Sequence, residues 1–433
     1  MRQSHQLPLV GLLLFSLIPR QQCEICKVSK ENKTALKPLI HTMINSNYTK
    51  GIQAAKVLLS LRLGGFLNQN QDQHLIEQFI LTVRSTEPSL TSGQLALAIL
   101  ALGACKGPDG ISINYSELVG DLENKFQAEI KNMEDHDGNP LTSYYQLSLD
   151  VLALCLFSGN YSIPKVAEIF KPGNKNYYFH EQFSVDTGAM AVLALICVRS
   201  KTRGQNQTDT KDLDNIDNHI KLLIRKILSQ KTENGLLGNI DSTGEAMQAL
   251  FVSSDYYNKN QWVCQKTRDT VLTEISQGAF RMPTAAAQIL PALMGKTYLD
   301  VNKDSSCVYG SDTFHISTQK PISVTPADSA PQIKVNYSVV IHNAKDRIVV
   351  SVADGSVFLN VMEQAQKENA ALFSFTAEET SWGPYITTVR GIKANTNDRT
   401  YWELLSNGKH LSKGAGSYVV HAGDDLEVRW STY

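Results

Sequence analysis

Residues 183–198 read FSVDTGAMAVLALICV, and this stretch decides the fold. It begins with Ser184 and Asp186, which are typical helix-start residues, and runs from Gly188 to Val198 without a charged or amide side chain. A helix that is apolar on every face has no side to present to water, so it must be buried all round. The sequence therefore predicts an inner helix whose hydrogen-bonding side chains lie only at its N-terminal end.

The Ala194-Leu195 pair late in this helix recurs along the chain. Neighbouring copies are 41 to 55 residues apart, at Ser60-Leu61, Ala101-Leu102, Ala153-Leu154, Ala249-Leu250 and Ala292-Leu293. Repeats of this length are typical of helix pairs. We therefore expect six inner helices.

Amphipathic segments lie between the apolar ones. One such face is formed by Leu118, Leu122, Phe126, Ile130 and Met133. Residues 75–83 and 213–227 show the same spacing of three and four. Buried helices that alternate with half-exposed ones pack most simply as two layers, so the fold class is α+β multidomain, with an α6/α6 barrel at residues 24–308 followed by a smaller β domain. An open solenoid would fit the period but needs polar end repeats, and neither end repeat is polar.

If the inner helices run parallel, their N-terminal ends share one opening, which we call the mouth. The polar residues expected there are Gln94, Thr142, Tyr144, Tyr145, Gln146, Asp186, Thr187, Asn239, Ser242, Thr243 and Gln288. Helix N-termini carry unpaired N–H groups and partial positive charge, which suit a ligand rich in carbonyl oxygens or carrying a phosphate. Helix capping alone explains Ser, Thr, Asp and Asn at such positions. It does not explain Tyr144, Tyr145, Gln146 or Gln288, which favour a binding site.

Residues 309–332 are expected to form an extended linker, because prolines fall among Ser, Thr and Asp without a helical period. Residues 333–433 are expected to form the β domain, with Asn407-Gly408 as a hairpin turn. The expected strands are Lys334–Ile341, Ile348–Val352, Leu372–Phe375, Tyr385–Val389, Tyr401–Leu405, Ser417–Val420 and Leu426–Trp430, and the expected helix is Val357–Lys367. Trp382 and Trp402 are either core residues or flat covers for an apolar ligand face in a cleft between domains.

The composition is that of a globular protein, with 42 % hydrophobic residues, 19 % charged residues and a formal net charge of −1 over 433 residues. This balance argues against a nucleic-acid partner. No stretch after the N-terminus reaches the roughly 18 apolar residues of a membrane span. Residues 1–23 fit a signal peptide, with Arg2 ahead of the short apolar core Leu7–Ile18, and predict a secreted, extracellular protein.

Six cysteines follow the signal peptide, namely Cys26, Cys105, Cys155, Cys197, Cys264 and Cys307. In a secreted chain they indicate three disulfides, whose pairing the sequence alone leaves open. The thiols are not clustered as in a zinc site, so no protein-bound metal is expected. Glycosylation triplets begin at Asn32, Asn47, Asn114, Asn160, Asn206 and Asn336, and indicate a glycoprotein.

Long segments of the chain resemble the cobalamin-carrier family, which contains transcobalamin, intrinsic factor and haptocorrin. The resemblance lies in YYQLSLDVLALCL (144–156), FSVDTGAMAVLALICV, GNIDSTGEAMQALF (238–251), SWGPYI (381–386), RTYWELL (399–405) and GAGSYVV (414–420). It covers the whole chain after the signal peptide. It implies a non-enzymatic, monomeric carrier in which the barrel and the β domain close on one cobalamin, the transported ligand, with corrinoid analogues and a cell-surface receptor as further partners.

The resemblance also implies the disulfides Cys26–Cys264, Cys105–Cys307 and Cys155–Cys197. From the barrel it implies cobalamin contacts at Gln94, Thr142, Tyr145, Asp186, Asn239 and Gln288, to which the mouth adds Tyr144, Gln146 and Ser242. From the β domain the candidate contacts are Ser381, Trp382, Gly383, Pro384, Tyr385, Tyr401, Trp402, Glu403, Leu404, Gly414, Ala415 and Gly416. Corrin carries many amide side chains, which need amide and hydroxyl partners rather than a matching net charge.

Phe183 stands where transcobalamin has a histidine that can ligate cobalt. A phenyl ring has no lone pair to donate, so we expect the upper face of cobalt to stay free of a protein ligand. His180, three residues earlier on a polar loop, is the nearby histidine that could reach it instead.

The main enzymatic alternative is an α6/α6-barrel glycosidase that uses Asp186 and Glu245 as its two carboxylates. A complement-type thioester domain would need a Gly-Cys-Gly-Glu-Gln segment, which the sequence lacks. An adhesion glycoprotein would explain the glycosylation triplets but not the polar mouth. The sequence contains neither a GxSxG nucleophile motif nor a GxxxxGKS phosphate loop, and we expect no catalytic cofactor.

Overall fold

The computed structural model describes residues 26–432 except 45–51, 53, 87–88, 108–110, 180, 203–209, 281, 311–330, 381–382, 412–413 and 417. The predicted signal peptide and nearly all of the predicted linker lie outside the described residues. The chain divides into two compact units, one from Met1–Lys131 and Thr142–Ser311 and the other from Asn132–Leu141 and Asp312–Tyr433. We call them the helical unit and the β unit.

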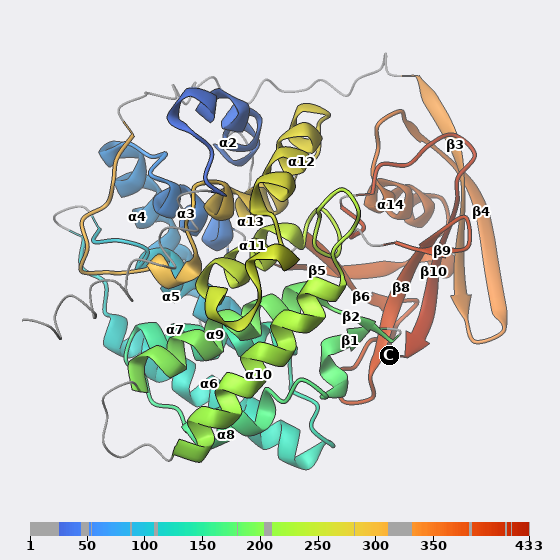
Figure 1. Ribbon diagram of the computed structural model, residues 1–433. Coiled ribbons are helices and arrows are strands. Elements are labelled where there is room, and N and C mark those ends of the chain that lie inside the picture. Colours follow the sequence, from blue (N-terminus) through green and yellow to red (C-terminus); the bar gives the residue numbers. More distant parts are fainter. Residues whose placement is uncertain are drawn as a thin grey trace, which may run out of the picture. The chain divides into compact units, whose positions relative to one another are not determined.

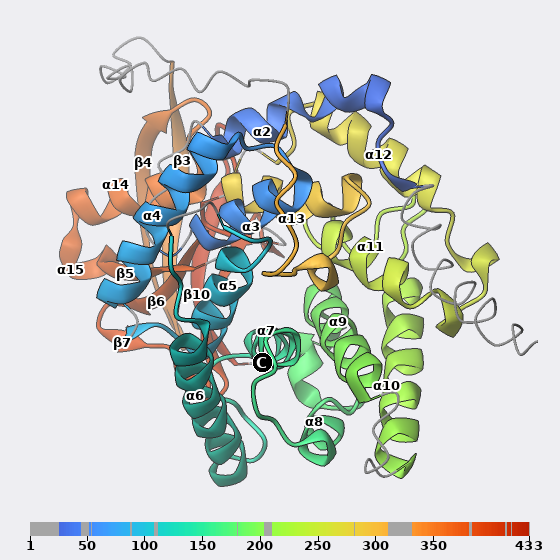
Figure 2. The ribbon, with the colours of Figure 1, turned by 90° about the vertical axis from the view of Figure 1, so that its left-hand side faces the viewer.

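Six helices form the inner layer of the helical unit. They are α3 (Ala54–Gly64), α5 (Ser92–Leu102), α7 (Tyr144–Leu156), α9 (Val185–Thr202), α11 (Thr243–Val252) and α13 (Pro283–Leu293). Each packs against the next one, and α13 packs back against α3, so the ring is closed (Figures 1 and 2). Every Ala-Leu repeat and its Ser-Leu variant falls inside one of these helices, which confirms the interpretation of the repeats.

Six further helices of the described residues alternate with the inner ones along the chain. They are α2 (Lys37–Ile44), α4 (Gln69–Thr86), α6 (Tyr115–Asp135), α8 (Ile163–Ile169), α10 (Thr210–Ser229) and α12 (Cys264–Ser276). Their apolar stripes are buried, as Leu122 and Phe126 of α6 show. The two sets of six form the predicted α6/α6 barrel. An open solenoid is excluded because the last inner helix contacts the first.

Two glycines allow the inner helices to approach each other closely at their starts. A Cβ atom on Gly93 of α5 would lie 2.5 Å from the Cβ of Gln146 on α7. A Cβ atom on Gly244 of α11 would lie 2.6 Å from the carbonyl oxygen of Gln288 on α13. Any larger residue would separate these helix pairs at the mouth.

Three disulfides join Cys26 to Cys264, Cys105 to Cys307 and Cys155 to Cys197. They are the three pairs that the family resemblance implies. The last of them links inner helices α7 and α9, whereas Cys105 and Cys307 lie beyond the C-terminal ends of inner helices.

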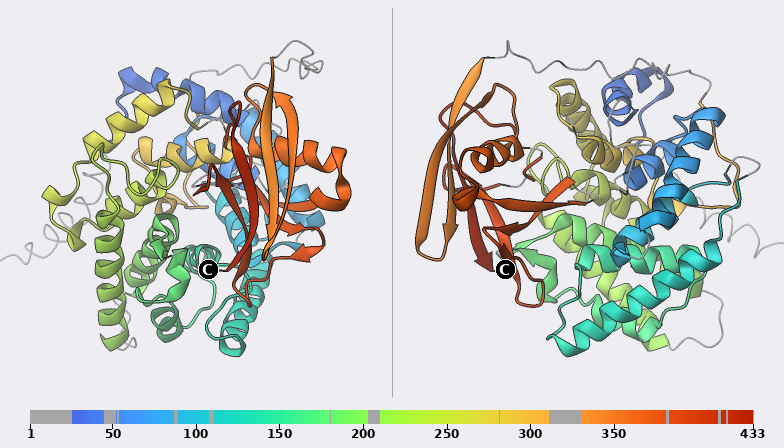
Figure 3. Two further views of the ribbon diagram at one scale, coloured as in Figure 1. Left: turned by 90° about the vertical axis from the view of Figure 1, so that its right-hand side faces the viewer. Right: turned by 180° about the vertical axis from the view of Figure 1, so that it is seen from behind.

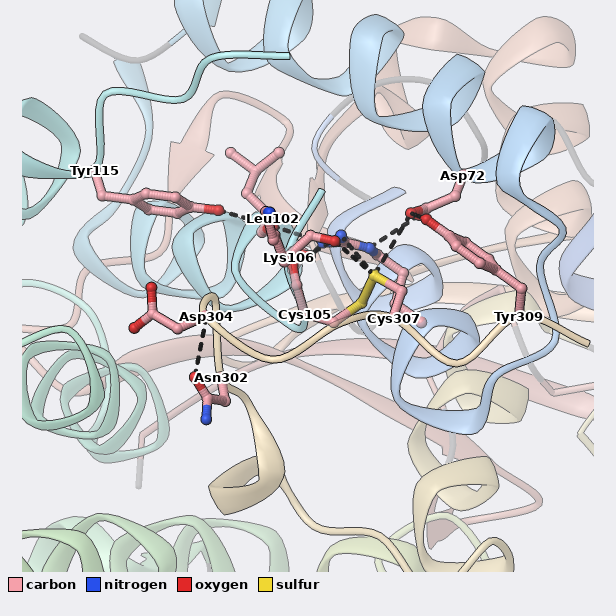
Figure 4. Close-up of a disulfide and its surroundings, with 11 residues drawn as sticks. Asp72, Leu102, Cys105, Lys106, Tyr115, Asn302, Asp304, Cys307 and Tyr309 are labelled. Atoms are coloured by element: carbon pink, nitrogen blue, oxygen red, sulfur yellow. Dashed lines mark hydrogen bonds and ion pairs between the residues drawn. A yellow bond between two sulfur atoms is a disulfide. The ribbon is translucent and has the colours of Figure 1, made fainter. Parts of the chain in front are cut away.

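Arg62 caps the C-terminal end of α5, at the end of the barrel away from the mouth. Its guanidinium donates to the carbonyl oxygens of Ala101 (2.8 Å), Leu102 (2.6 Å) and Cys105 (3.0 Å), which the helix itself leaves unpaired. Its Nε lies 2.9 Å from Oδ1 of Asp72, and both side chains are buried. Figure 4 shows Asp72 beside the Cys105–Cys307 disulfide, with the Tyr309 hydroxyl donating to its other oxygen at 3.2 Å.

The β unit contains a five-stranded sheet and a three-stranded sheet. The first has the order β4-β3-β10-β8-β9, and its strands are β3 (Gln332–Ile341), β4 (Ala344–Ala353), β8 (Thr400–Ser406), β9 (Lys409–His410) and β10 (Asp425–Thr432). β3 and β10 are parallel and the other neighbours antiparallel. The second sheet contains β5 (Phe375–Thr380), β6 (Gly383–Val389) and β7 (Ile392–Lys393).

Helix α14 (Phe358–Glu368) covers one face of the larger sheet in the β unit, which is coloured orange to red in Figure 3. Its residues Phe358 and Val361 share a core with Tyr337 of β3 and with Val389 of the smaller sheet. The Asn407-Gly408 turn is confirmed as the β8–β9 hairpin, because both residues have positive φ as that turn requires.

Two predicted strands of the β unit are wrong. Residues 370–373 form a short helix, α15 (Ala370–Phe373), because the Asn369 side chain accepts the N–H of Leu372 and caps it; β5 starts only at Phe375. Residues 418–420, the described part of the second predicted strand, show only an isolated bridge from Val419 to Val357. The two-residue strands β7 and β9 were not predicted, because segments so short leave no alternation to detect.

We expect Arg62→Met to lower the free energy of unfolding by about 3–5 kcal/mol, because it leaves the buried Asp72 carboxylate without its counter-ion. Denaturant titration with the disulfides intact measures this. Arg84→Met, at an exposed position of α4, is the matched control and should change stability by less than about 0.5 kcal/mol. A loss at Arg62 no larger than the control's would contradict the capping role.

Candidate ligand-binding site

A connected group of polar side chains lies at the starts of the inner helices. The Lys56 ammonium of α3 donates to Gln288 Oε1 of α13 at 3.0 Å and lies 3.3 Å from Glu245 Oε1 of α11. Gln288 Nε2 donates to Asp186 Oδ1 of α9 at 3.2 Å, and the Tyr145 hydroxyl of α7 donates to Glu245 Oε1 at 2.7 Å. We call these five side chains the mouth network. The helix starts therefore point to one place, as the parallel arrangement predicts.

Burial shapes the charges of this network. Lys56, Glu245 and Gln288 are 1 %, 0 % and 2 % exposed, and Asp186 is partly exposed. Burial raises the pKa of Asp186 to about 8, and the nearby Glu245 carboxylate adds to the rise. Burial also raises the pKa of Glu245 and lowers the pKa of Lys56. Each ion is costly alone, so the Lys56 ammonium and the Glu245 carboxylate stabilise one another.

Helix α5 contributes Gln94 to the mouth. Its Oε1 accepts the N–H of Thr91 at 2.9 Å, while the Thr91 hydroxyl accepts the N–H of Gln94 at 3.3 Å, which is a capping box. The Thr91 hydroxyl also donates to Gln146 Oε1 of α7 at 2.6 Å. Within the described part of the chain, the side-chain nitrogens of both glutamines have no hydrogen-bond partner. Capping thus engages one end of each amide and leaves the other available.

Asn239 and Ser242 precede α11 and differ in whether their side chains can still donate a hydrogen bond to a ligand. Asn239 Oδ1 accepts the N–H of Ser242 at 2.8 Å, and its side-chain nitrogen has no partner among the residues the structure describes. The Ser242 hydroxyl donates to the carbonyl of Leu237 at 2.7 Å and is 2 % exposed. Asn239 can therefore donate to a ligand, whereas the Ser242 hydroxyl is used within its own loop.

Thr142 is held by Glu129, a buried residue of α6. Its hydroxyl donates to Glu129 Oε1 at 2.8 Å and its N–H to Oε2 at 3.2 Å. The Ser92 hydroxyl of α5 donates to the same Oε1 at 2.9 Å. The partly exposed Thr142 oxygen can therefore act only as an acceptor toward a ligand.

Tyr144 does not belong to the mouth network. It is 1 % exposed, and its ring packs edge-on against Phe170 and Tyr177. Its hydroxyl accepts a hydrogen bond from Asn174 at 2.5 Å. As a ligand contact it is therefore a poor candidate, and its neighbour Tyr145 takes that place.

Phe183 ends a short hairpin of β1 (Tyr178–Phe179) and β2 (Gln182–Phe183) that precedes α9. Its ring lies 6.2 Å from that of Tyr177, and the Lys226 ammonium lies 5.8 Å from its centroid. A Cβ atom on Gly188 would lie 2.4 Å from the Phe183 Cζ, so the ring packs on the first turn of α9. His180 lies outside the described residues.

Candidates in the β unit fall into different environments. Ser381 and Trp382 lie outside the described residues, whereas Tyr385 is 46 % exposed and follows Gly383 and the half-buried Pro384 on β6. Trp402 is 4 % exposed, its ring lies 4.9 Å from that of Trp430, and its Nε1 donates to the carbonyl of Ile392 at 3.2 Å. Trp402 is therefore a core residue of the β unit.

Strand alternation divides the remaining β8 candidates. Tyr401 and Glu403 point to the face opposite to that of Trp402 and Leu404, so one surface cannot use all four. Glu403 is 5 % exposed and accepts hydrogen bonds from Tyr401 (3.3 Å) and Ser431 (2.9 Å).

The Gly414–Gly416 segment has an exposed first residue and a buried middle one. The carbonyl of Ala415 accepts the N–H of Leu359 at 2.9 Å, at the start of α14. A Cβ atom on Gly414 would meet no atom within 4 Å. The segment is thus anchored by its middle residue, and Gly414 is left accessible.

Sequence reasoning missed Lys56 and Glu129 as parts of the site. Lys56 is the one charged residue in Ala54–Leu61, and it lies in the first turn of its helix, as Gln94 and Glu245 do in theirs. That position is the signal that could have identified it. Glu129 lies among ordinary charged residues of an amphipathic helix, and no pattern distinguishes it.

The fold and the mouth define a helical barrel protein with a small β unit and a cluster of connected polar side chains at the helix starts. A family model described as eukaryotic cobalamin-binding protein matches residues 8–328, and a domain of unknown function matches residues 355–432. The chain belongs to the eukaryotic cobalamin-binding protein family.

Individual relatives agree with this assignment. The chain is 63 % identical to Transcobalamin-1 of Homo sapiens over 100 % of both chains. It is 32 % identical to Cobalamin binding intrinsic factor of Homo sapiens, over 94 % of both. A crystal structure of haptocorrin in complex with Cbi superimposes with a TM-score of 0.84 at 58 % identity, over 94 % of this chain and 99 % of that one.

Neither a membrane span nor a metal cluster is seen in the described residues. None of their helices is both long and apolar enough to cross a membrane. No three of their His, Cys, Asp and Glu side chains gather in a way that could hold a metal ion.

We expect Asp186→Asn to change how stability depends on pH. The folded protein holds a proton on Asp186 more tightly than the unfolded chain does, so the stability it contributes is full below about pH 4 and is lost as the pH rises toward 8. The advantage of the wild type over Asp186→Asn in free energy of unfolding should therefore shrink from about pH 5 to about pH 8, by at most about 1.4 kcal/mol per pH unit.

Denaturant titrations of the wild type and the variant at several pH values measure this difference. Asp214→Asn, at an exposed position of α10, is the matched control for an Asp-to-Asn change outside the mouth network. A difference between the wild type and Asp186→Asn that stays constant from about pH 5 to about pH 8 would refute the proposed burial of the Asp186 charge.

Proposed function

We propose that this chain binds one cobalamin at the mouth and carries it as an exported transport glycoprotein. The observation that supports this most directly is the direction of the amides at the mouth. Gln94 and Asn239 turn their oxygens toward backbone N–H groups of their own helix starts, so their nitrogens are left to donate outward. Such donors fit the carbonyl oxygens of the amide side chains around a corrin ring.

Acceptors at the mouth complement these donors. The Thr142 and Tyr145 hydroxyls give their protons to Glu129 and Glu245, so toward a ligand their oxygens can accept. A carboxamide has both an N–H donor and a carbonyl acceptor, so a ligand with several carboxamides can satisfy both kinds of group. An unpaired donor in a closed site costs about 1–3 kcal/mol, so this match selects the ligand.

We propose that residues 381–385, Leu404 and Gly414–Gly416 of the β unit also contact the ligand. Tyr385 supports this role because it is one of the few large apolar side chains with a substantial exposed area among the described residues. Trp402, in contrast, would act by holding β8 in place rather than by touching the ligand.

We further propose that no protein histidine binds the cobalt. The Phe183 ring is packed by Tyr177, Gly188 and Lys226, and it offers no lone pair. Metal coordination at this position would require a side chain that this chain does not have there.

A glycosidase is disfavoured by the position of its second carboxylate. Glu245 is 0 % exposed, and its Oε1 is shared by Tyr145 and Lys56. A catalytic acid or base must reach the scissile bond of a sugar, and this carboxylate is enclosed by the network.

Export and glycosylation follow from the predicted signal peptide, the three disulfides and the glycosylation triplets. Asn32, Asn114 and Asn160 are exposed and suit glycan attachment, whereas Asn336 is half-buried within β3. Asn47 and Asn206 lie outside the described residues. A monomeric state, a cell-surface receptor and binding of further corrinoid analogues complete the proposal.

Titration with aquocobalamin followed by gel filtration tests the function. We expect a red protein peak with one cobalamin per chain, and an absorption spectrum close to that of free aquocobalamin. A colourless peak would reject cobalamin binding. A spectrum of the imidazole type, lost in His180→Ala, would reject the absence of a histidine ligand while leaving binding intact.

A further inference from the structure

We propose that Lys56 and Glu245 are positioning residues that set the hydrogen-bond direction and the charge of the mouth, so that it accepts ligand amides and rejects ligand carboxylates. This inference rests on the proposed function. It concerns two enclosed side chains that act through Gln288, Asp186 and Tyr145 rather than by contact with the ligand.

The first step is the orientation of the Gln288 amide. An ammonium group can only donate, so the Gln288 atom 3.0 Å from Lys56 must be the oxygen. The nitrogen is then fixed toward Asp186, 3.2 Å away, and has one N–H left to donate. Without the lysine, the amide could rotate by half a turn and present its oxygen in place of its nitrogen.

The second step is the orientation of the Tyr145 hydroxyl. It donates to Glu245 Oε1 at 2.7 Å, so its oxygen faces elsewhere as an acceptor. An ionised carboxylate can only accept, which fixes this direction, and the nearby Lys56 ammonium opposes the burial that raises the Glu245 pKa. Lys56 therefore fixes two polar groups, one directly and one through Glu245.

The third step is the charge that a ligand group meets. Lys56 and Glu245 form a neutral pair, Asp241 adds negative character, and burial already disfavours the charged form of the Asp186 carboxyl beside them. The binding of a neutral carboxamide depends little on this balance of charges. A carboxylate of the same shape would be repelled, since the Lys56 charge is already taken up by Glu245.

The test compares cobalamin with its monocarboxylic acids, each with one side-chain amide hydrolysed, at neutral pH. The readout is the ratio of the dissociation constants of acid and amide, taken for the acid that the wild type rejects most. Glu245→Gln keeps the volume and leaves Lys56 as an uncompensated cation, so we expect the ratio to fall at least tenfold. A merely structural role would alter stability and leave this ratio unchanged.

Lys56→Met should weaken cobalamin binding about tenfold to a hundredfold, the range for a misdirected buried hydrogen bond, and Lys56→Arg should retain more affinity because it still donates to Gln288. Lys221→Met, at an exposed position of α10, is the matched control and should bind as the wild type does. A wild-type ratio in Glu245→Gln, or wild-type affinity in Lys56→Met, would overturn the proposal.

Each variant has an alternative if it does not fold. The ratio in Glu245→Gln decides if Lys56→Met is unfolded, and Lys56→Met together with Lys56→Arg decides if Glu245→Gln is unfolded. A wild type that binds no cobalamin would refute the proposed function itself, which is a different result from an unchanged ratio in a protein that binds.

Discussion

The mouth depends on the hydrogen bond and the ion pair that the buried Lys56 ammonium makes with Gln288 and Glu245. A lysine that is 1 % exposed is stable only when acceptors surround it, and Gln288 and Glu245 supply them from two other helices. The three helix starts are thereby held within hydrogen-bond distance of one charge. Gly244 permits the close approach of α11 and α13 that this requires. The enclosed Lys56 and Glu245 side chains thereby hold in place the Gln288 and Tyr145 side chains that are proposed to face the ligand.

The two ends of the barrel have opposite hydrogen-bonding needs. At the C-terminal end the helix carbonyls need donors, and Arg62 supplies them while Asp72 balances its charge next to the Cys105–Cys307 disulfide. At the N-terminal end the helices present N–H groups and polar side chains that remain partly available. Between the two ends the inner helices are mostly apolar, with a few buried polar exceptions such as Asp150 of α7 and Gln248 of α11.

The sequence predicted the barrel well because its repeats and apolar runs are long. It could not give the rotation of a helix about its axis, which packing decides. Tyr144 and Tyr145 are neighbours separated by about 100° on an α-helix, and only the second faces the mouth network. The sequence left open whether Trp402 is a core residue or a ligand contact. Strand alternation tells which residues share a face of the sheet but not which face is covered. Lys56 was missed because a lone lysine near a helix start can also extend to solvent.

Hydrogen exchange of the backbone with and without cobalamin tests whether the inner helix starts form one ligand site. We expect slower exchange on binding at the first turns of α5, α7, α9 and α11, and little change at their C-terminal ends. Slower exchange at the Arg62 end of the barrel, or no change at the helix starts in a protein saturated with cobalamin, would contradict a single site at the helix starts.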